Sequence, residues 1–210
     1  MDALKAHVAQ AALAYVKGHK VLGIGSGLTV QHFIEALASH KYDLDACVAS
    51  SEATAAQLKA CGIPVIDCNE VSEIPLYIDS ADEIDADGRM IKGGGGAHTR
   101  EKILASLSRS FLCLVEQRKV VARLGQFPLP IEVLPMARSS VARAMVVLGG
   151  APEYRRGFVT DNGNIILDVY HLNFNTPIAL EEQLKNIPGV VDSGLFAKRR
   201  ADTVLIAEKV

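Results

Sequence analysis

Four carboxylates crowd a short stretch of the sequence directly after an apolar run. Asp79, Asp82, Glu83 and Asp85 follow the strand-like residues 76–78. In an open parallel sheet, ligands bind in the crevice beyond the carboxyl ends of the strands. The acidic segment is therefore a candidate ligand site, and the alternative is a solvated acidic turn. Hard cations also bind to acidic clusters, but no His-x-His or His/Glu pattern accompanies this one, so we expect no metal.

A lysine and four consecutive glycines follow the acidic segment. Lys92 precedes Gly93–Gly96, and a helical stretch comes directly after them. Glycine adopts backbone angles that are closed to other residues, and it lets the main chain approach a ligand closely. We interpret this segment as a cradle for a negatively charged oxygen, and the alternative is a flexible linker.

The helical stretch after the glycines begins with a candidate proton-transfer group. Glu101 falls in its first turn, where the helix dipole favours a carboxylate and where the side chain can point back toward the glycines. Glu101 is therefore a candidate general base, and the alternative is an ordinary acid at a helix start. His98 is the only histidine near this cluster, and we expect it to be structural.

A second glycine-containing loop lies near the amino terminus. Gly25-Ser26-Gly27-Leu28-Thr29 follows an apolar strand and opens a helix, a setting in which main-chain N–H groups can hold an anion. A tight turn without ligand is the alternative. Dinucleotide binding is a weaker interpretation, because the GxGxxG spacing is missing and no acid ends the next strand, residues 47–49.

The elements that must position these residues alternate between strand and helix. This alternation predicts a parallel sheet with right-handed crossovers. We expect helices over residues 2–17, 29–39, 52–60 and 98–108, and strands over 21–24, 47–49, 64–66, 76–78 and 111–115.

The pattern changes beyond Phe127. There we expect a strand over 131–133, a helix over 137–148, a hairpin turn at 161–164, a helix over 177–186, and strands near Val190 and Val204. The fold class is thus α/β, with a Rossmann-like parallel-sheet domain and a second, smaller α+β domain. We assign residues 1–126 and 199–210 to the first domain and 127–198 to the second, with the last strand returning to the first sheet.

Composition narrows the kind of partner. The chain has 210 residues, of which 49% are hydrophobic, and a formal net charge of -2. Mixed charges offer no basic field for a nucleic acid and no polybasic membrane anchor, so a small molecule is the expected partner. The amino terminus lacks the basic region of a signal peptide, and no apolar run is long enough to cross a bilayer. The four cysteines lie in or beside apolar stretches, and we expect reduced, buried thiols and a cytoplasmic location.

The motifs together resemble type A ribose-5-phosphate isomerase. The segments GIGSGLTV, DSADEID, KGGGGAHTREK, the Lys119 region and FPLPIEVLP occur in the order of that family along nearly the whole chain. The resemblance implies interconversion of D-ribose 5-phosphate and D-ribulose 5-phosphate in the non-oxidative pentose phosphate pathway, without a cofactor. It also implies a homodimer or a dimer of dimers.

The resemblance also implies roles for individual residues. Glu101 matches the catalytic base of the family, and Asp79, Asp82 and Lys92 match its other catalytic, ligand-contacting residues. Implied substrate contacts are Ser26, Gly27, Leu28, Thr29, Asp79, Ser80, Ala81, Asp82, Lys92, Gly93, Gly94, Gly95 and Lys119.

The sequence departs from the family pattern at a few positions. The family loop usually reads GTGST, and Ser26 and Leu28 replace its first threonine and its serine, so one hydroxyl is missing. Ser80 stands where the family usually has glycine, and a turn that needed a positive φ there would be strained. Gln117 and Arg118 before Lys119 replace the more usual Ala-Ser.

Chemistry suggests how the groups would act. Moving a carbonyl between two neighbouring carbons requires a base that removes a proton from one carbon, which forms an enediolate, and then returns a proton to the other carbon. We expect Glu101 to shuttle the proton and Lys92 with Gly93–Gly95 to hold the negative oxygen. Alternatives are a sugar-phosphate deaminase, lactonase or coenzyme A transferase on a related fold, and a ligand-sensing domain without enzymatic activity.

Overall fold

The computed structural model describes residues 2–39 and 44–207, which form two compact units. The first unit takes the chain up to Ala81, the segment Arg100–Val120 and the chain from Ala201 onward. The second unit takes Asp82–Thr99 and Val121–Arg200. Each unit has its own hydrophobic core.

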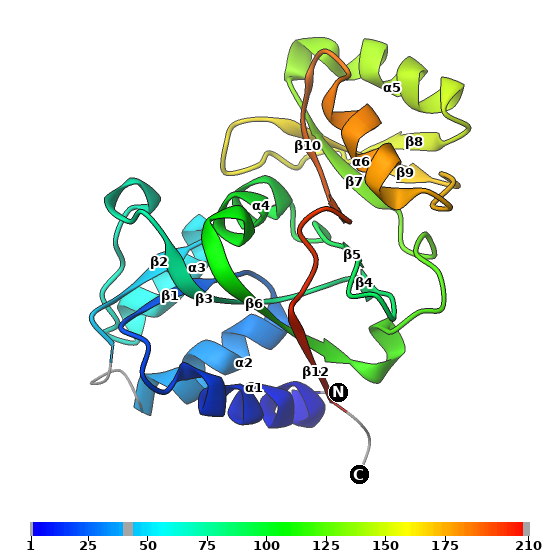
Figure 1. Ribbon diagram of the computed structural model, residues 1–210. Helices are drawn as coiled ribbons and strands as arrows, with labels where there is room; N and C mark the ends of the chain where they lie inside the picture. Colours follow the sequence, from blue (N-terminus) through cyan, green and yellow to red (C-terminus); the bar gives the residue numbers. More distant parts are fainter. Residues whose placement is uncertain (1, 40–43, 208–210) are drawn as a thin grey trace. The chain divides into compact units, whose positions relative to one another are not determined.

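The first unit is built on a parallel sheet, as the alternating pattern predicts (Figure 1). The strand order is β12-β6-β3-β1-β2, and every neighbouring pair is parallel. The strands are β1 (Val21–Ile24), β2 (Ala46–Ala49), β3 (Ile74–Ser80), β6 (Ser108–Glu116) and β12 (Thr203–Ala207). The last strand pairs with β6, which confirms its expected return to the first sheet.

Helices supply the rest of this unit. They are α1 (Asp2–Val16), α2 (Leu28–Leu37), α3 (Glu52–Ala60) and α4 (His98–Leu107), which runs from the second unit into the first. The apolar stripe of α1, which includes Val8 and Ala12, packs in one core with Phe33 of α2 and Leu114 of β6. A helical spacing of three to four residues places such side chains on one face, which explains why the expected helices form.

One expected strand is wrong. Residues 64–66 make only an isolated parallel bridge between Val65 and Cys47. Pro64 has no N–H group, so a ladder of hydrogen bonds cannot extend through it. The contact stops at two hydrogen bonds, Cys47 N to Pro64 O at 2.8 Å and Ile66 N to Cys47 O at 3.0 Å.

The second unit carries an antiparallel sheet in the order β10-β7-β9-β8. Its strands are β7 (Leu129–Val133), β8 (Ala151–Tyr154), β9 (Ile165–Tyr170) and β10 (Val190–Ser193), and its helices are α5 (Arg138–Val147) and α6 (Pro177–Lys185). The expected turn at 161–164 closes the connection between β8 and β9, and Gly163 has a φ of 77° there. Short 3-10 turns in the chain are η2 (Cys68–Glu70), η3 (Gln117–Lys119) and η4 (Pro135–Ala137).

A small antiparallel sheet, absent from the sequence expectations, places residues 82–99 in the second unit. It consists of β4 (Glu83–Ile84), β5 (Met90–Ile91) and β11 (Leu195–Phe196), with β5 in the middle. The buried Glu83 carboxylate also accepts hydrogen bonds from the N–H groups of Gly125 and Phe127. The compact units therefore differ from the expected domain boundaries, which put this segment in the first domain.

The four cysteines differ in burial. Cys47 and Cys113 are buried, whereas Cys61 and Cys68 are only half-buried, so the expectation of four buried thiols is wrong for the last two. Burial raises the pKa of the Cys47 thiol to about 12.

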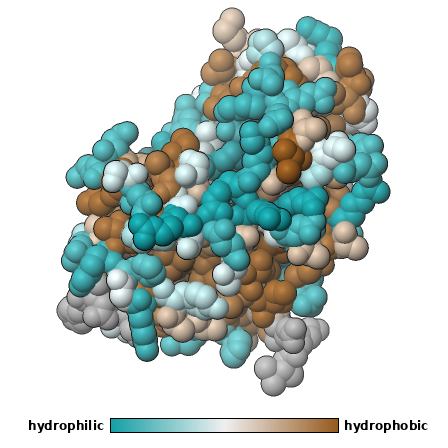
Figure 2. All heavy atoms as spheres, viewed as in Figure 1, coloured by the Kyte–Doolittle hydropathy of each residue, from teal (hydrophilic) through white to brown (hydrophobic). Residues whose placement is uncertain are grey.

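Hydrophilic residues cover much of the face seen in Figure 2, with apolar residues reaching the surface between them. Within residues 2–39 and 44–207, no helix has the length and apolar character to cross a membrane.

Candidate active site

The loop after β1 is held against the end of β3 by one carboxylate. Gly25 N donates to Ile78 O at 2.9 Å, and Ser26 N donates to Asp79 Oδ1 at 3.1 Å. A Cβ atom at position 25 would lie 1.9 Å from Cγ of Asp79. Glycine is therefore required at position 25 because the Asp79 side chain occupies the space that any other side chain would need.

Asp79 itself is fully buried and accepts several hydrogen bonds. Ser80 N donates to Oδ1 at 2.7 Å, in addition to Ser26 N, and the Tyr77 hydroxyl donates to Oδ2. These donors hold both oxygens of the buried carboxylate in fixed positions. Asp79 thus fixes the geometry of the loop as well as being a candidate ligand contact.

A chain of hydroxyl groups extends from the loop. Ser26 Oγ lies 2.8 Å from Ser50 Oγ and donates to Ser51 Oγ at 3.1 Å. Thr54 Oγ1 accepts from Ser51 Oγ and donates to Gly25 O at 2.8 Å. Ser51 also accepts from Thr54 N and so caps α3. The Ser26 hydroxyl is therefore part of a network that holds the loop in place.

The remaining loop residues face different environments. Gly27 has a φ of 98° and precedes α2, so the turn uses a conformation that favours glycine. Leu28 is 61% exposed, whereas Thr29 is buried. The family pattern would therefore place a hydroxyl at an exposed position at the start of α2, where this chain has leucine.

Ser80, Ala81 and Lys119 meet at the end of β3. Ser80 and Ala81 are buried, and the Lys119 ammonium donates to the carbonyl oxygen of Ala81. Among the described non-glycine residues, only His171 has a positive φ. Ser80 therefore has no backbone strain from a positive φ, because it is the last residue of the extended strand β3.

Glu101 is buried in the first turn of α4, with 4% of its surface exposed. The neighbouring Arg100 forms an ion pair of 2.8 Å with Glu52 at the start of α3. Burial, followed by the negative charges of Asp79 and Glu101, raises the pKa of Tyr77 well above its usual value. The negative charges of Asp79 and Glu101 both disfavour ionisation of the Tyr77 hydroxyl, which therefore keeps its proton.

The second unit contains the other candidates. Lys92 is buried, its N–H donates to Gly194 O at 2.8 Å, and its ammonium lies 5.6 Å from the centre of the Phe196 ring. A Cβ atom at Gly194 would lie 2.0 Å from the Lys92 carbonyl oxygen, so this close approach requires glycine. The main chain at Lys92 is thereby fixed between β5 and β11.

Gly93–Gly96 form a tight turn after Lys92, which we call the glycine turn. Gly96 N donates to Gly93 O at 2.9 Å, and Gly94 N donates to Asp82 Oδ2 at 2.8 Å. Gly94 and Gly95 at its tip are exposed. The fully buried His98 packs beneath Gly93, where a Cβ atom would lie 2.6 Å from His98 Nδ1, which fits the structural role expected for this histidine.

Sequence reasoning missed several residues that hold these groups. Tyr77 was predictable as a neighbour of Asp79, because residues two apart in a strand project from the same face. Glu132 is a charge inside an otherwise apolar strand, and it accepts a hydrogen bond from Thr99 in the first turn of α4, which also carries Glu101. Arg155 and Ser50 gave no local signal, since their partners are distant in sequence.

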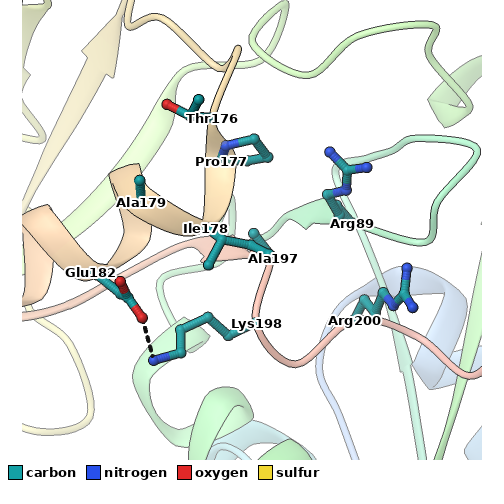
Figure 3. A pocket seen from close by; sticks show the side chains of 9 residues that line it. All are labelled: Arg89, Thr176, Pro177, Ile178, Ala179, Glu182, Ala197, Lys198 and Arg200. Atoms are coloured by element: carbon teal, nitrogen blue, oxygen red, sulfur yellow. Dashed lines mark ion pairs between the residues drawn. The ribbon is translucent and has the colours of Figure 1, made fainter.

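A cavity of about 620 Å³ in the second unit contains none of the predicted site residues (Figure 3). Its lining residues are Arg89, Thr176, Pro177, Ile178, Ala179, Glu182, Ala197, Lys198 and Arg200. Its three cations have partners: Lys198 pairs with Glu182 at 2.9 Å, Arg89 pairs with Asp85 and Asp87, and Arg200 donates to the carbonyl oxygen of Asp87 at 3.3 Å. In the part of the chain that the structure describes, no three His, Cys, Asp or Glu side chains group as metal ligands.

Fold and site together define a class of protein. A parallel sheet with buried polar side chains at the carboxyl ends of its strands is typical of α/β enzymes that act on small molecules.

The chain belongs to the ribose 5-phosphate isomerase A family. Residues 46–210 match the family model described as "Ribose 5-phosphate isomerase A (phosphoriboisomerase A)". Ribose-5-phosphate isomerase A of Legionella pneumophila (strain Corby) is 60% identical over 207 residues, which are 99% of this chain and 96% of that protein. The resemblance that the motifs indicate is thereby confirmed.

Solved structures of the family have the same fold. The crystal structure of ribose 5-phosphate isomerase A from Neisseria gonorrhoeae has a TM-score of 0.97 and 42% identity, covering 99% of this chain and 93% of that one. A D-ribose-5-phosphate isomerase in complex with phospho-erythronic acid has a TM-score of 0.95 and 32% identity, covering 99% of this chain and 95% of that one. These similarities confirm the α/β fold class.

Proposed function

We propose that the chain interconverts D-ribose 5-phosphate and D-ribulose 5-phosphate through an enediolate. Membership of the ribose 5-phosphate isomerase A family supports this activity. The observation that carries the mechanism is the burial of Glu101, because a carboxylate shielded from water is a stronger base than a free one.

Glu101 is the proposed proton shuttle. It removes the proton from C2 of the open-chain aldose, the C–H electrons form the C1–C2 double bond, and the carbonyl oxygen takes up the negative charge. Return of a proton to C1, with transfer of the proton of the C2 hydroxyl to the oxygen on C1, gives the ketose. One carboxylate suffices for both transfers, because C1 and C2 are adjacent and a single base can reach both of them from one face of the planar intermediate.

Lys92 and the main-chain N–H groups of Gly93, Gly94 and Gly95 are proposed to hold the developing negative oxygen. A positive charge and fixed N–H donors stabilise an oxyanion strongly in a water-poor environment. Burial of the Lys92 side chain and the defined turn of Gly93–Gly96 support this assignment.

The other acids and the Ser26 loop are proposed to hold the sugar phosphate. Asp79 and Asp82 bind sugar hydroxyls, and one of them opens the furanose ring by proton transfer before isomerisation. The further substrate contacts proposed are Ser26, Gly27, Leu28, Thr29, Ser80, Ala81 and Lys119. The position of the loop at the start of α2 supports anion binding, since main-chain N–H groups and the helix dipole both attract negative charge there.

The cellular setting is also a proposal. We infer a cytoplasmic enzyme of the non-oxidative pentose phosphate pathway that acts on a small-molecule substrate without a cofactor, nucleic acid or membrane. We further propose a homodimer or a dimer of dimers. Exposed apolar side chains on and near α5, among them Met136, which is 95% exposed, and Val147, which is 85% exposed, support self-association.

Conversion of ribose 5-phosphate to ribulose 5-phosphate by the purified chain in the presence of EDTA tests the activity. The proposal expects turnover that survives the chelator and needs no added cofactor. A folded chain that releases ammonia from an amino sugar phosphate, or that requires an acyl-CoA, and that leaves ribose 5-phosphate unchanged would contradict it.

A further inference from the structure

Arg155 reaches the glycine turn from the sheet of the second unit. Its Nη1 donates to the carbonyl oxygens of Gly93 at 3.2 Å and Gly94 at 3.1 Å. The residue follows β8 directly, and its own N–H donates to Ile166 O of β9 at 3.0 Å. One guanidinium therefore connects a hydrogen-bonded sheet to two successive peptide groups of the turn.

The guanidinium is held by a second residue of the same sheet. Arg155 Nε donates to Asp168 Oδ2 at 2.8 Å, and Nη2 donates to Oδ1 of the same carboxylate. Both side chains are largely buried, with 18% and 17% exposed. The guanidinium carbon also lies 5.3 Å from the centre of the Phe158 ring. A bidentate pair of this kind fixes the plane of the guanidinium as well as its position.

This contact determines where the N–H groups of the turn point. A trans peptide group is planar, so its N–H points opposite to its C=O. Since the carbonyls of Gly93 and Gly94 face Arg155, the N–H groups of Gly94 and Gly95 face away from it. The first donates to Asp82 Oδ2 at 2.8 Å, and the second lies at the exposed tip of the turn.

Glycine alone would not maintain this orientation. Gly93 and Gly96 have φ values of 104° and 79°, and a glycine peptide can rotate through more conformations than any other. Gly96 is constrained from outside, because a Cβ atom there would lie 2.3 Å from the Phe158 ring. Arg155 supplies the corresponding constraint at the tip, where a Cβ atom on Gly95 would meet nothing within 4 Å.

We propose that Arg155, oriented by Asp168, is a positioning residue that aims the N–H groups of Gly94 and Gly95. The inference rests on the proposed function, in which these N–H groups hold the enediolate oxygen; the N–H group of Gly94 also donates to Asp82. Arg155 does not touch the substrate in this account. Arg155 fixes the direction of these N–H groups before the reaction, and their interaction with the substrate oxygen strengthens as negative charge develops on that oxygen.

The consequence is a selective effect on turnover. Interactions that are stronger in the transition state than in the bound substrate change kcat and leave KM nearly unaltered. Loss of one preorganised oxyanion donor costs a factor of about 10²–10³ in kcat. A donor that is misdirected part of the time costs less, so Arg155→Met should lower kcat about 10–100-fold with less than about a threefold change in KM.

The decisive experiment combines kinetics with inhibition by phospho-erythronic acid. The carboxylate of this compound carries a negative charge on two oxygens, as an enediolate does, whereas ribose 5-phosphate has a neutral carbonyl there. Arg155→Met should weaken the inhibitor about as much as it lowers kcat/KM, while the KM of ribose 5-phosphate changes little. A merely structural role would lower the active fraction and leave the inhibition constant unchanged.

Controls separate the possible failures. Arg138→Met removes an arginine that stacks 5.0 Å from the Tyr154 ring in the same unit without contacting the turn, and it should keep wild-type kinetics. Asp168→Asn should also lower kcat, by a smaller factor than Arg155→Met. This second variant tests the positioning role if Arg155→Met fails to fold. An inactive wild type refutes the proposed function itself. An active wild type with equally active Arg155→Met and Asp168→Asn refutes the positioning role alone.

Discussion

The hydroxyl of Tyr77 donates a hydrogen bond to Asp79 Oδ2 inside the first unit, where neither side chain is exposed to solvent. The Tyr77 ring packs on Phe111, with ring centres 4.8 Å apart. The aromatic core thus supports the carboxylate that fixes the Ser26 loop.

Tyr77→Phe should therefore disturb the loop while keeping the core. The substitution retains the ring and its contact with Phe111 but leaves the buried Asp79 carboxylate with one donor fewer. We expect the free energy of unfolding to fall by about 1–3 kcal/mol, the cost of an unsatisfied buried polar group. KM for ribose 5-phosphate should rise, because the Ser26 loop is held by the same carboxylate.

Urea unfolding and steady-state kinetics measure both effects. Tyr154→Phe is the matched control, since Tyr154 is 37% exposed on β8, and it should leave stability and kinetics unchanged. Wild-type stability and KM in Tyr77→Phe would show that the hydrogen bond does not organise the loop.

The Tyr77–Asp79 pair also illustrates what a sequence can reveal. Alternation in a strand predicts that the two side chains share a face, and apolar flanks predict that the strand is buried. The same local rules predicted the strands of the parallel sheet and its main helices. They failed at Pro64, where the sequence is strand-like but the missing N–H group limits pairing to one bridge.

Other features depend on contacts between distant segments. The short strands β4, β5 and β11 have two residues each, too few for any periodicity, and they form because Met90 and Ile91 pair with Phe196 and Leu195. The link between Arg155 and the glycine turn joins residues about 60 positions apart. No propensity or motif encodes such contacts, so their roles emerge only in three dimensions.

Leu28→Ser tests the departure from the family loop. Residue 28 begins α2 and is 61% exposed, so a serine can be accommodated without repacking. If the loop binds the phosphate group, the added hydroxyl should lower KM for ribose 5-phosphate with little effect on kcat. An unchanged KM would indicate that the Ser26 hydroxyl network already compensates for the missing group.

Glu132→Gln tests the anchor of α4. The Glu132 carboxylate is buried, which opposes its charge, but hydrogen bonds from Thr99, Asn164, Thr160 and Asn162 outweigh burial and lower its pKa below the usual 4.5. An amide in its place presents N–H groups toward these donors. We expect Glu132→Gln to lose about 1.5–3 kcal/mol of unfolding free energy at pH 7, the contribution of a hydrogen bond to a charged group.

The pH dependence of this loss gives a second readout. Because the folded-state pKa of Glu132 is depressed, its stabilisation is fully present above the unfolded-state pKa and is lost as the pH falls through the folded-state value. The difference in unfolding free energy between wild type and Glu132→Gln should therefore shrink below about pH 4.5. Glu153→Gln on the surface of β8 is the control, and a difference independent of pH would refute the role of the charge.

Glu101 carries the central claim, and Glu101→Gln isolates it. The amide keeps the size of the side chain in its buried place but cannot accept the proton from carbon. The variant should stay folded and still bind ribose 5-phosphate, while kcat falls by at least about a thousandfold, toward the upper range for loss of a general base.

The most direct measurement is deuterium incorporation during conversion of ribose 5-phosphate in D₂O, followed by NMR for wild type and Glu101→Gln. Proton transfer by Glu101 predicts deuterium at C1 of the ribulose 5-phosphate formed by the wild type, and neither product nor exchange with folded Glu101→Gln. Near-normal turnover by folded Glu101→Gln, with deuterium still entering C1, would contradict proton transfer by this carboxylate.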